Sequence, residues 1–193
     1  MSMKEQVYHI VITKYCDHDC PLCCNKFYDL DRLPTVTGDN LREANTVCLT
    51  GGEPFVLQPD TISGLSKALK EQYPNIQRIY VYTSGLRLGS FVGKEIGYMY
   101  RFIDGINVAP KSVKEWRSFV EFIKKDIWRF MPDRFASSSN RLYVFPEQQD
   151  NWDSVKNEYH IHLGNIWKVI GRKWNNTFNT PDNEHFVRLP ILF

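Results

Sequence analysis

Short apolar segments recur along most of the chain, and longer amphipathic segments separate them. The first, over residues 7–13, is a nearly continuous run of apolar residues, many of them β-branched. Such a run is typical of a strand that is buried on both faces, as in a parallel sheet. Four later segments also predict strands: residues 46–50, 76–83, 104–109 and 141–145.

Helical periodicity marks the segments between these strands. A helix is predicted over residues 60–72 because apolar residues recur there every three or four positions, at Ile62, Leu65, Leu69 and Tyr73. The clearest helical pattern begins at residue 112, where Ser112-x-x-Glu115 forms a capping-box motif. One apolar stripe continues from there through Val113, Trp116, Val120, Ile123, Ile127 and Phe130. Weaker patterns predict helices over residues 39–44 and 88–102.

Strands that alternate with helices of about 12–20 residues predict repeated βαβ units around a parallel sheet, and therefore an α/β fold. After Pro146 the alternation weakens, although residues 184–190 predict one last strand. We expect a single domain with a core over residues 1–146. Residues 147–193 would complete this core and cap its substrate side, with a small apolar cluster formed by Trp152, Trp167 and Trp174.

The composition indicates a globular protein of one domain. The chain has 193 residues, 42% of them apolar, and a mean hydropathy of −0.40. No apolar run approaches the roughly 18–20 residues that span a bilayer, and the polar start shows no signal peptide. We therefore expect a cytoplasmic protein without a membrane segment, in a reducing compartment where clustered cysteines indicate a metal or catalytic site. The net charge of +2 gives no indication of nucleic-acid binding, and no feature indicates an oligomeric state.

Three cysteines follow the first predicted strand with the spacing Cys16-x3-Cys20-x2-Cys23. Iron–sulfur clusters are normally held by four thiolates, so a set of three leaves one iron open for chemistry. A structural zinc site is the alternative, but zinc commonly takes four ligands from two separated pairs. Later candidates are Cys48 and the distant His160-x-His162 pair, and the cysteines could also be grouped by accident.

A glycine-rich run, Thr50-Gly51-Gly52-Glu53-Pro54, follows the second predicted strand. Glycines at the carboxyl end of a parallel strand allow a ligand to approach the backbone, and ligands in such sheets bind at that edge. A carboxylate placed there can accept a hydrogen bond from an ammonium group. Because the cysteine loop also follows a strand, both features are predicted to face one pocket.

This combination resembles the radical SAM superfamily, whose signature is Cys-x3-Cys-x-aromatic/apolar-Cys followed by Gly-Gly-Glu. The matching residues are Cys16, Cys20, Leu22 and Cys23, then Gly51, Gly52, Glu53 and Pro54. The resemblance implies a partial (βα)6 barrel with a short variable C-terminal segment. It also implies a [4Fe-4S] cluster on the three cysteines, with S-adenosyl-L-methionine (SAM) bound to the fourth iron. By the same resemblance, residues 51–54 bind the methionine amino group and Leu22 lies close to the adenine.

Two further segments resemble the family more loosely. Thr83-Ser84-Gly85 is similar to its Thr-Asn-Gly, and Asn107 to Lys111 occupy the place of its ribose contacts. Both segments are also typical of an ordinary loop between a strand and a helix. The resemblance covers residues 7–146 and implies a mechanism. An external electron, from a flavodoxin- or ferredoxin-like donor, leads to SAM cleavage and to hydrogen abstraction from a substrate.

The remaining residues narrow the type of enzyme. Only Cys24 and Cys48 remain for other roles, too few for a second cluster, and Cys48 is expected to be a core residue. The chain is similar in length to 7-carboxy-7-deazaguanine synthases and to activating enzymes of glycyl-radical proteins. Its Gly-Gly-Glu-Pro run followed by Leu57-Gln58 also resembles a motif of both groups. The synthases have Asp-Thr after the third cysteine and Ser-Pro-Lys after the fourth strand. Here Cys24-Asn25 stands in place of Asp-Thr, and Ala109 stands in place of the Ser of Ser-Pro-Lys. These departures argue against a purine substrate.

We therefore expect a radical SAM enzyme that acts on a small, nucleotide-like molecule. Lys111 would bind an anionic group of the substrate or of SAM, or would simply be a solvated residue at a helix start. An activating enzyme that installs a radical on a partner protein is the second hypothesis. A zinc-binding module without catalytic activity is the third, and it requires a fourth ligand beside the cysteine loop.

Overall fold

The computed structural model describes residues 4–18, 20, 23–27, 29–125, 138–161, 163, 166–173 and 180–191. Its centre is a seven-stranded sheet in which every neighbouring pair is parallel, with the order β6-β5-β4-β3-β2-β1-β7. The strands are β1 (Val7–Thr13), β2 (Thr46–Gly51), β3 (Arg78–Thr83), β4 (Gly105–Val108), β5 (Asn140–Val144), β6 (Trp167–Gly171) and β7 (Glu184–Arg188). The predicted α/β class and parallel sheet are confirmed.

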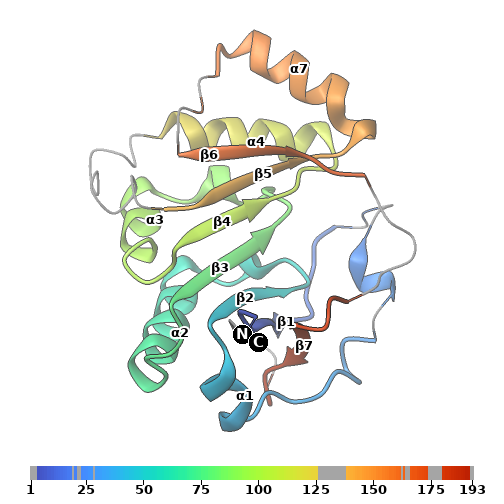
Figure 1. The fold of residues 1–193 in the computed structure, drawn as a ribbon. Coiled ribbons are helices and arrows are strands. Elements are labelled where there is room, and N and C mark those ends of the chain that lie inside the picture. Colours follow the sequence, from blue (N-terminus) through green and yellow to red (C-terminus); the bar gives the residue numbers. More distant parts are fainter. Residues whose placement is uncertain are drawn as a thin grey trace.

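Helices connect the strands along one side of this sheet (Figure 1). They are α1 (Gly38–Glu43), α2 (Pro59–Gln72), α3 (Gly93–Met99), α4 (Val113–Lys124) and α7 (Gln149–Glu158). Short 3-10 helices are η1 (Cys24–Phe27), η2 (Pro54–Val56), η3 (Leu88–Ser90) and η4 (Pro146–Gln148). From β1 to β6 each new strand is added on the same side of the previous one, which is the winding of a partial barrel. Right-handed crossovers then place the helices on one common face.

The two faces of the sheet differ in chemistry. The face under the helices is apolar and fully buried, with Ile10, Leu49, Val81, Ile106 and Leu142 in one core cluster. The alternate positions of the same strands point to the opposite, inner face, and many of them are polar. These inner residues include His9, Cys48, Tyr80, Tyr82, Asn107, Arg141, Tyr143 and Glu184. The strands are therefore buried on both sides, as predicted, but only one side is a hydrophobic core.

The C-terminal segment contributes more than the one predicted strand. The strand predicted over 184–190 is present as β7, which pairs with β1 in parallel register. The segment also contains α7 and β6, which were not predicted. Trp152 of α7 packs on Trp116 of α4 at 5.4 Å between ring centroids, and Trp167 of β6 meets Phe119 edge-on at 5.1 Å. These two tryptophans belong to the core on the helix side, and Trp174 lies outside the described residues.

The helix predicted over residues 88–102 is divided into η3 and α3. Gly89 explains the break, because a Cβ at this position would lie 2.8 Å from the carbonyl oxygen of Ser118 in α4. The chain has to pass close to α4 here and resumes a regular helix only at Gly93. The helix predicted from Ser112 is confirmed as α4, which ends at Lys124. Of the predicted apolar stripe, Trp116 and Val120 are buried but Val113 is exposed, and Ile127 and Phe130 lie outside the described residues.

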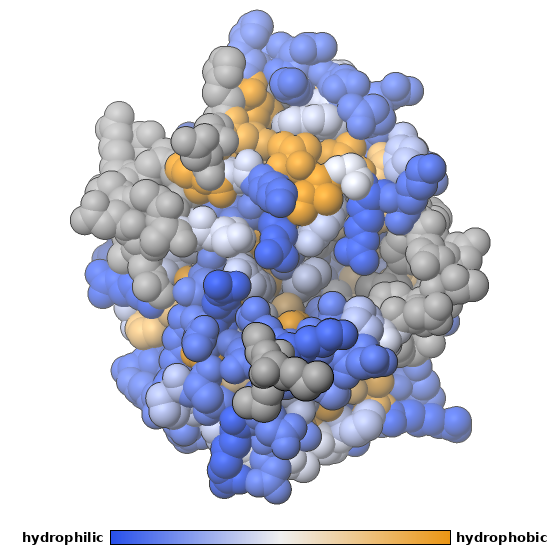
Figure 2. Space-filling model, in the orientation of Figure 1, coloured by the Kyte–Doolittle hydropathy of each residue, from blue (hydrophilic) through white to orange (hydrophobic). Residues whose placement is uncertain are grey.

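The surface seen in Figure 2 is mostly hydrophilic, with apolar side chains gathered over β6 and between α7 and α4. Val169 of β6 is one of the exposed apolar residues, with 45% of its surface accessible. In the part of the chain that the structure describes, no helix is long and apolar enough to cross a membrane.

Candidate functional site

A cavity of about 520 Å³ lies on the inner face of the sheet and extends to its carboxyl edge. Nearly all described residues predicted for the site line this cavity: Cys16, Cys20, Cys23, Gly51, Gly52, Glu53, Thr83, Ser84, Asn107 and Lys111. Pro54 is buried beside it and opens η2. Leu22 lies outside the described residues. The loops after β1, β2, β3 and β4 therefore meet at one place, as expected where parallel strands end.

The three cysteines of the loop after β1 are free thiols on one side of the cavity. Cys16 is exposed, whereas Cys20 and Cys23 are half-buried. Burial raises the pKa of Cys20 to about 11, although the nearby Lys111 ammonium opposes this shift. Burial also raises the pKa of Cys16. Metal ligation requires thiolates, so a bound cation would have to displace these protons.

The glycines after β2 allow two stretches of backbone to come together. A Cβ on Gly51 would lie 2.2 Å from the Thr13 carbonyl oxygen, and one on Gly52 would lie 2.0 Å from that of Tyr15. Gly51 also has a φ of 128°, which side-chain-bearing residues rarely adopt. The Gly52 amide donates to the Thr13 carbonyl at 2.8 Å, and the Glu53 amide donates to that of Tyr15 at 2.8 Å. The glycines therefore hold the start of the cysteine loop against β2, a role that differs from the predicted close approach of a ligand.

Glu53 connects the ends of β2 and β3. Its carboxylate is 1% exposed. One oxygen accepts from the Phe55 amide at 3.1 Å and from the Thr83 hydroxyl at 2.6 Å. The other accepts from the Ser84 amide at 2.9 Å and the Ser84 hydroxyl at 2.7 Å. Four donors fill the usual acceptor capacity of a carboxylate. In this structure Glu53 therefore orders the neighbouring loops, and the role predicted for it toward an ammonium group stays a prediction.

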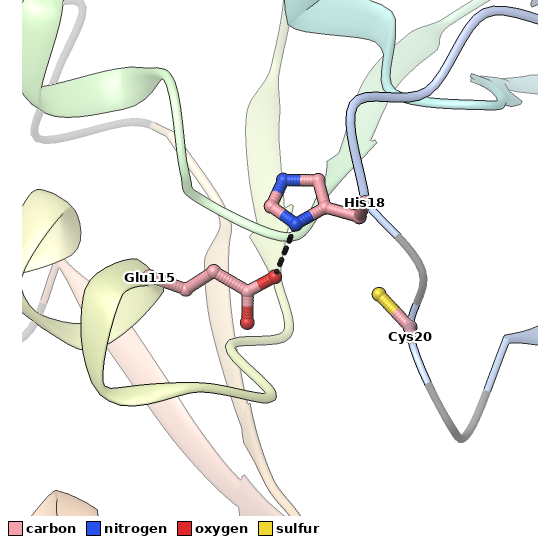
Figure 3. A group of neighbouring side chains, drawn as sticks. All are labelled: His18, Cys20 and Glu115. Atoms are coloured by element: carbon pink, nitrogen blue, oxygen red, sulfur yellow. Dashed lines mark ion pairs between the residues drawn. The ribbon is translucent and has the colours of Figure 1, made fainter.

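His18 and Glu115 form a polar contact in the site that the sequence analysis missed. His18 lies between the first two cysteines, and Glu115 projects from the first turn of α4 (Figure 3). The His18 Nδ1 atom is 3.2 Å from a Glu115 carboxylate oxygen, and its Nε2 atom is 3.3 Å from the Ser84 hydroxyl. A nitrogen of His18, the sulfur of Cys20 and a Glu115 oxygen lie within 4.8 Å of one another. This group joins the cysteine loop to α4 and could also hold a cation.

The capping-box motif at the start of α4 explains why this contact was missed. The Ser112 hydroxyl accepts from the Glu115 amide at 3.3 Å, as the motif predicts. The Glu115 carboxylate, however, accepts from the Lys111 amide and contacts His18 instead of returning to the Ser112 amide. With 1% exposure, Glu115 is more deeply buried than a capping residue needs to be. In the sequence, only the position of His18 inside the cysteine motif could have indicated this contact.

Asn107 and Lys111 are the polar groups contributed by the end of β4. Asn107 is 1% exposed, and neither its amide nitrogen nor its oxygen has a hydrogen-bond partner among the described residues. A buried amide without partners is unfavourable by about 1–3 kcal/mol. The Lys111 ammonium donates to the Ala109 carbonyl at 3.2 Å and lies close to Cys20. Both side chains line the cavity and offer hydrogen bonds to a ligand.

Cys48 was predicted to be a core residue, and it is 3% exposed. Its side chain, however, lies on the inner face of β2, where it lines the cavity and hydrogen-bonds with Tyr82. Burial raises the pKa of this thiol to about 12. The described structure therefore separates Cys48 from the three cysteines of the loop.

No protein-family profile matches the chain, and no curated protein matches it significantly. A search of solved structures finds coproporphyrinogen III oxidase (HemN) from Escherichia coli, which is a radical SAM enzyme. The sequence identity is 15% and the TM-score is 0.44. The match covers 90% of this chain but only 45% of the length of that enzyme.

Proposed function

We propose that this chain is a radical SAM enzyme that acts on a small molecule. The main support is the arrangement of three loop thiols on the same cavity as the ends of β2, β3 and β4. The Cys16, Cys20 and Cys23 thiols would hold three irons of a [4Fe-4S] cluster, since three thiolates leave one iron available for a ligand. When bound, the cluster and SAM supply one-electron chemistry that ends in the abstraction of a hydrogen atom from the substrate.

The residues around the thiols fit a bound amino acid and nucleoside. The unpartnered Asn107 amide can both donate and accept, as a ribose hydroxyl requires. The Lys111 ammonium can bind a carboxylate, and the Ser84 hydroxyl lies at the same edge. The Glu53 carboxylate holds Thr83 and Ser84 in place through its four hydrogen bonds. Leu22 would contact the adenine, as the family resemblance implies.

The chain's own contribution to the reaction is to orient the substrate and to exclude water. The inner face is lined with buried groups, and Cys48 and Tyr80 have at most 5% of their surface exposed. Buried walls of this kind would limit the access of water to a reactive radical. A flavodoxin- or ferredoxin-like protein would supply the electron.

The nucleotide-like substrate remains a narrower part of the proposal. Its support is the sequence similarity to 7-carboxy-7-deazaguanine synthases around residues 51–58 and 107–111. In place of the synthases' Asp-Thr, the cysteine loop ends in Cys24-Asn25, and the Asn25 side-chain Nδ2 donates to the Gly51 carbonyl at 2.7 Å. No observation on the described surface favours the activating enzyme, which stays the alternative within the superfamily.

A zinc-binding module is the second candidate, because His18 and Glu115 lie beside Cys20. Histidine, carboxylate and thiolate are all zinc ligands. Against this assignment, His18 already contacts Glu115 and Ser84, and Cys16 and Cys23 are not members of the group.

Metal analysis after anaerobic reconstitution separates the two candidates. The proposed enzyme should bind about four irons per chain, and Cys20→Ala should lose them. Cys48→Ala is the matched control, since it removes a thiol outside the loop, and it should bind iron like the unmodified protein. One zinc per chain, no iron, and loss of zinc in His18→Ala would contradict the proposal and favour the zinc module.

A further inference from the structure

An arginine lies in the deep part of the cavity, away from the loops that meet at the carboxyl edge. Arg141 of β5 is in register with Asn107 of β4, which is in register with Tyr82 of β3. Ser84 and Tyr143 lie two residues further along their strands. At about 3.3 Å per residue, Arg141 is level with Asn107 and roughly 7 Å below Ser84 at the carboxyl edge.

Tyrosine side chains lie close to the Arg141 guanidinium, and it has no acidic partner among the described residues. Its central carbon lies 5.3 Å from the Tyr80 ring centroid, over the ring face. The guanidinium also hydrogen-bonds with the Tyr143 side chain, and Tyr82 lies nearby. Among the described residues no carboxylate lies within ion-pairing distance of Arg141. A half-buried cation without a counter-ion is unfavourable, and a bound anion would remove this penalty.

The carboxylates that line the cavity already have other partners. Glu5 pairs with Arg78 at 3.9 Å. Glu184 binds His9 at 3.0 Å. Glu53 accepts the four hydrogen bonds described above. These three carboxylates face five cationic side chains of the same cavity, namely Arg78, Lys111, Arg141, Arg172 and Lys173. The lining therefore has an excess of positive charge.

A second arginine of the cavity, Arg172, contacts the same tyrosine as Arg141. The Arg172 guanidinium carbon is 5.3 Å from the centroid of the Tyr143 ring, and Arg141 neighbours the same tyrosine. Each guanidinium thus makes a cation–π contact with the face of one tyrosine ring. A planar guanidinium held in this way is suited to the two oxygens of a carboxylate or phosphate.

We infer that the substrate carries a carboxylate or phosphate group and that Arg141 binds this group inside the half-barrel. Phe145 and Phe186 also line the cavity and give it apolar walls beside the arginine. The substrate would thus combine an anionic group with an apolar or aromatic body. This inference rests on the proposed function, because it names the class of molecule that the enzyme would act on.

Paired anionic and neutral probes test this inference on the reconstituted full chain. Binding of benzoate, its neutral isostere benzamide, and phenyl phosphate would be measured by anaerobic calorimetry. At least one anionic probe should bind, and benzamide should bind about tenfold more weakly or not at all. Arg141→Met should weaken binding of that anion by about tenfold or more, because a charge-assisted hydrogen bond is lost. Arg141→Lys should retain part of the affinity. Benzoate and phenyl phosphate distinguish a carboxylate from a phosphate site.

Arg78→Met is the matched control, because it removes a cation that lines the same cavity but is paired with Glu5. It should leave anion binding within about twofold of the unmodified protein. Equal losses in the two variants, or binding that does not depend on Arg141, would overturn the inference. So would one-for-one competition by SAM, which would assign Arg141 to the cofactor. If anions bind through Arg141 but SAM is not cleaved, the anion site at Arg141 stands, whereas the proposed function, and with it the assignment of the anion as a substrate, fails.

Discussion

Replacement of Glu53 by glutamine tests the account of how the site is held together. In the structure one carboxylate oxygen accepts from the Ser84 amide at 2.9 Å and from the Ser84 hydroxyl at 2.7 Å. Glutamine keeps one acceptor oxygen but places an NH₂ group at the other position. If that oxygen keeps its contacts with Phe55 and Thr83, the NH₂ group faces Ser84. The hydroxyl can rotate and accept, whereas the backbone N–H cannot.

The free-energy cost follows from these contacts. A hydrogen bond to a charged group contributes about 1.5–3 kcal/mol, and a buried N–H left without a partner costs about 1–3 kcal/mol. These terms overlap at the Ser84 amide, so we expect Glu53→Gln to lower the free energy of unfolding by about 3 kcal/mol. For a chain of this length, the loss corresponds to a melting temperature about 6–12 °C lower. Reversible urea unfolding, with the slope checked for each variant, is the primary assay.

Glu71→Gln is the matched control, because Glu71 is exposed on α2 and has only a surface contact with Lys67 at 3.8 Å. It should change the free energy of unfolding by less than about 0.5 kcal/mol. If Glu53→Gln is as stable as Glu71→Gln, the Glu53 carboxylate does not hold the ends of β2 and β3 together, and the reasoning is refuted.

Three further predictions concern the glycines, an acidic residue and the inner cysteine. Gly52→Ala should displace the Tyr15 carbonyl and prevent iron binding. Gly64→Ala in α2 is its control, because the added Cβ would meet nothing within 4 Å; it should bind iron and gain up to about 1 kcal/mol in stability. A normal iron content in Gly52→Ala would contradict this prediction. The hydrogen bond with His9 lowers the pKa of Glu184, so its stabilising effect is present above the unfolded-state pKa of 4.5 and is lost as the pH falls below that value. Urea unfolding between about pH 5 and 3 should therefore show a steeper loss for the unmodified protein than for Glu184→Gln, and identical slopes would refute it. Since burial raises the pKa of Cys48 to about 12, iodoacetamide at neutral pH should modify it only after unfolding, as followed by mass spectrometry; rapid modification in the native state would argue against its burial.

Much of the sheet could be predicted from local pattern, because its central strands are short segments rich in β-branched and aromatic residues. The meeting of the cysteine loop and Glu53 was also predictable, since both follow neighbouring parallel strands. β6 was missed for a physical reason. It is an edge strand with one deeply buried residue, Trp167, followed by exposed Lys168 and Val169, so it lacks the apolar run of a central strand.

The parts of the site that could not be predicted depend on contacts between distant segments. The spacing of Ser112 and Glu115 describes a local cap, but the Glu115 side chain bonds to a histidine almost a hundred residues earlier in the chain. Gly51 and Gly52 are required by the approach of the β1 backbone, which no local pattern reveals. The position of Arg141 in the cavity could not be predicted either, because the alternation of side chains along a strand does not reveal which face of the sheet lines a cavity.

Reductive cleavage of SAM is the most direct test of the central claim. The anaerobically reconstituted protein would be reduced with dithionite in the presence of SAM, and 5′-deoxyadenosine would be quantified by chromatography and mass spectrometry. The account predicts 5′-deoxyadenosine from the unmodified chain and from Cys48→Ala, and none above background from Cys16→Ala, Cys20→Ala or Cys23→Ala. No 5′-deoxyadenosine from an unmodified protein with a full complement of iron would contradict the account.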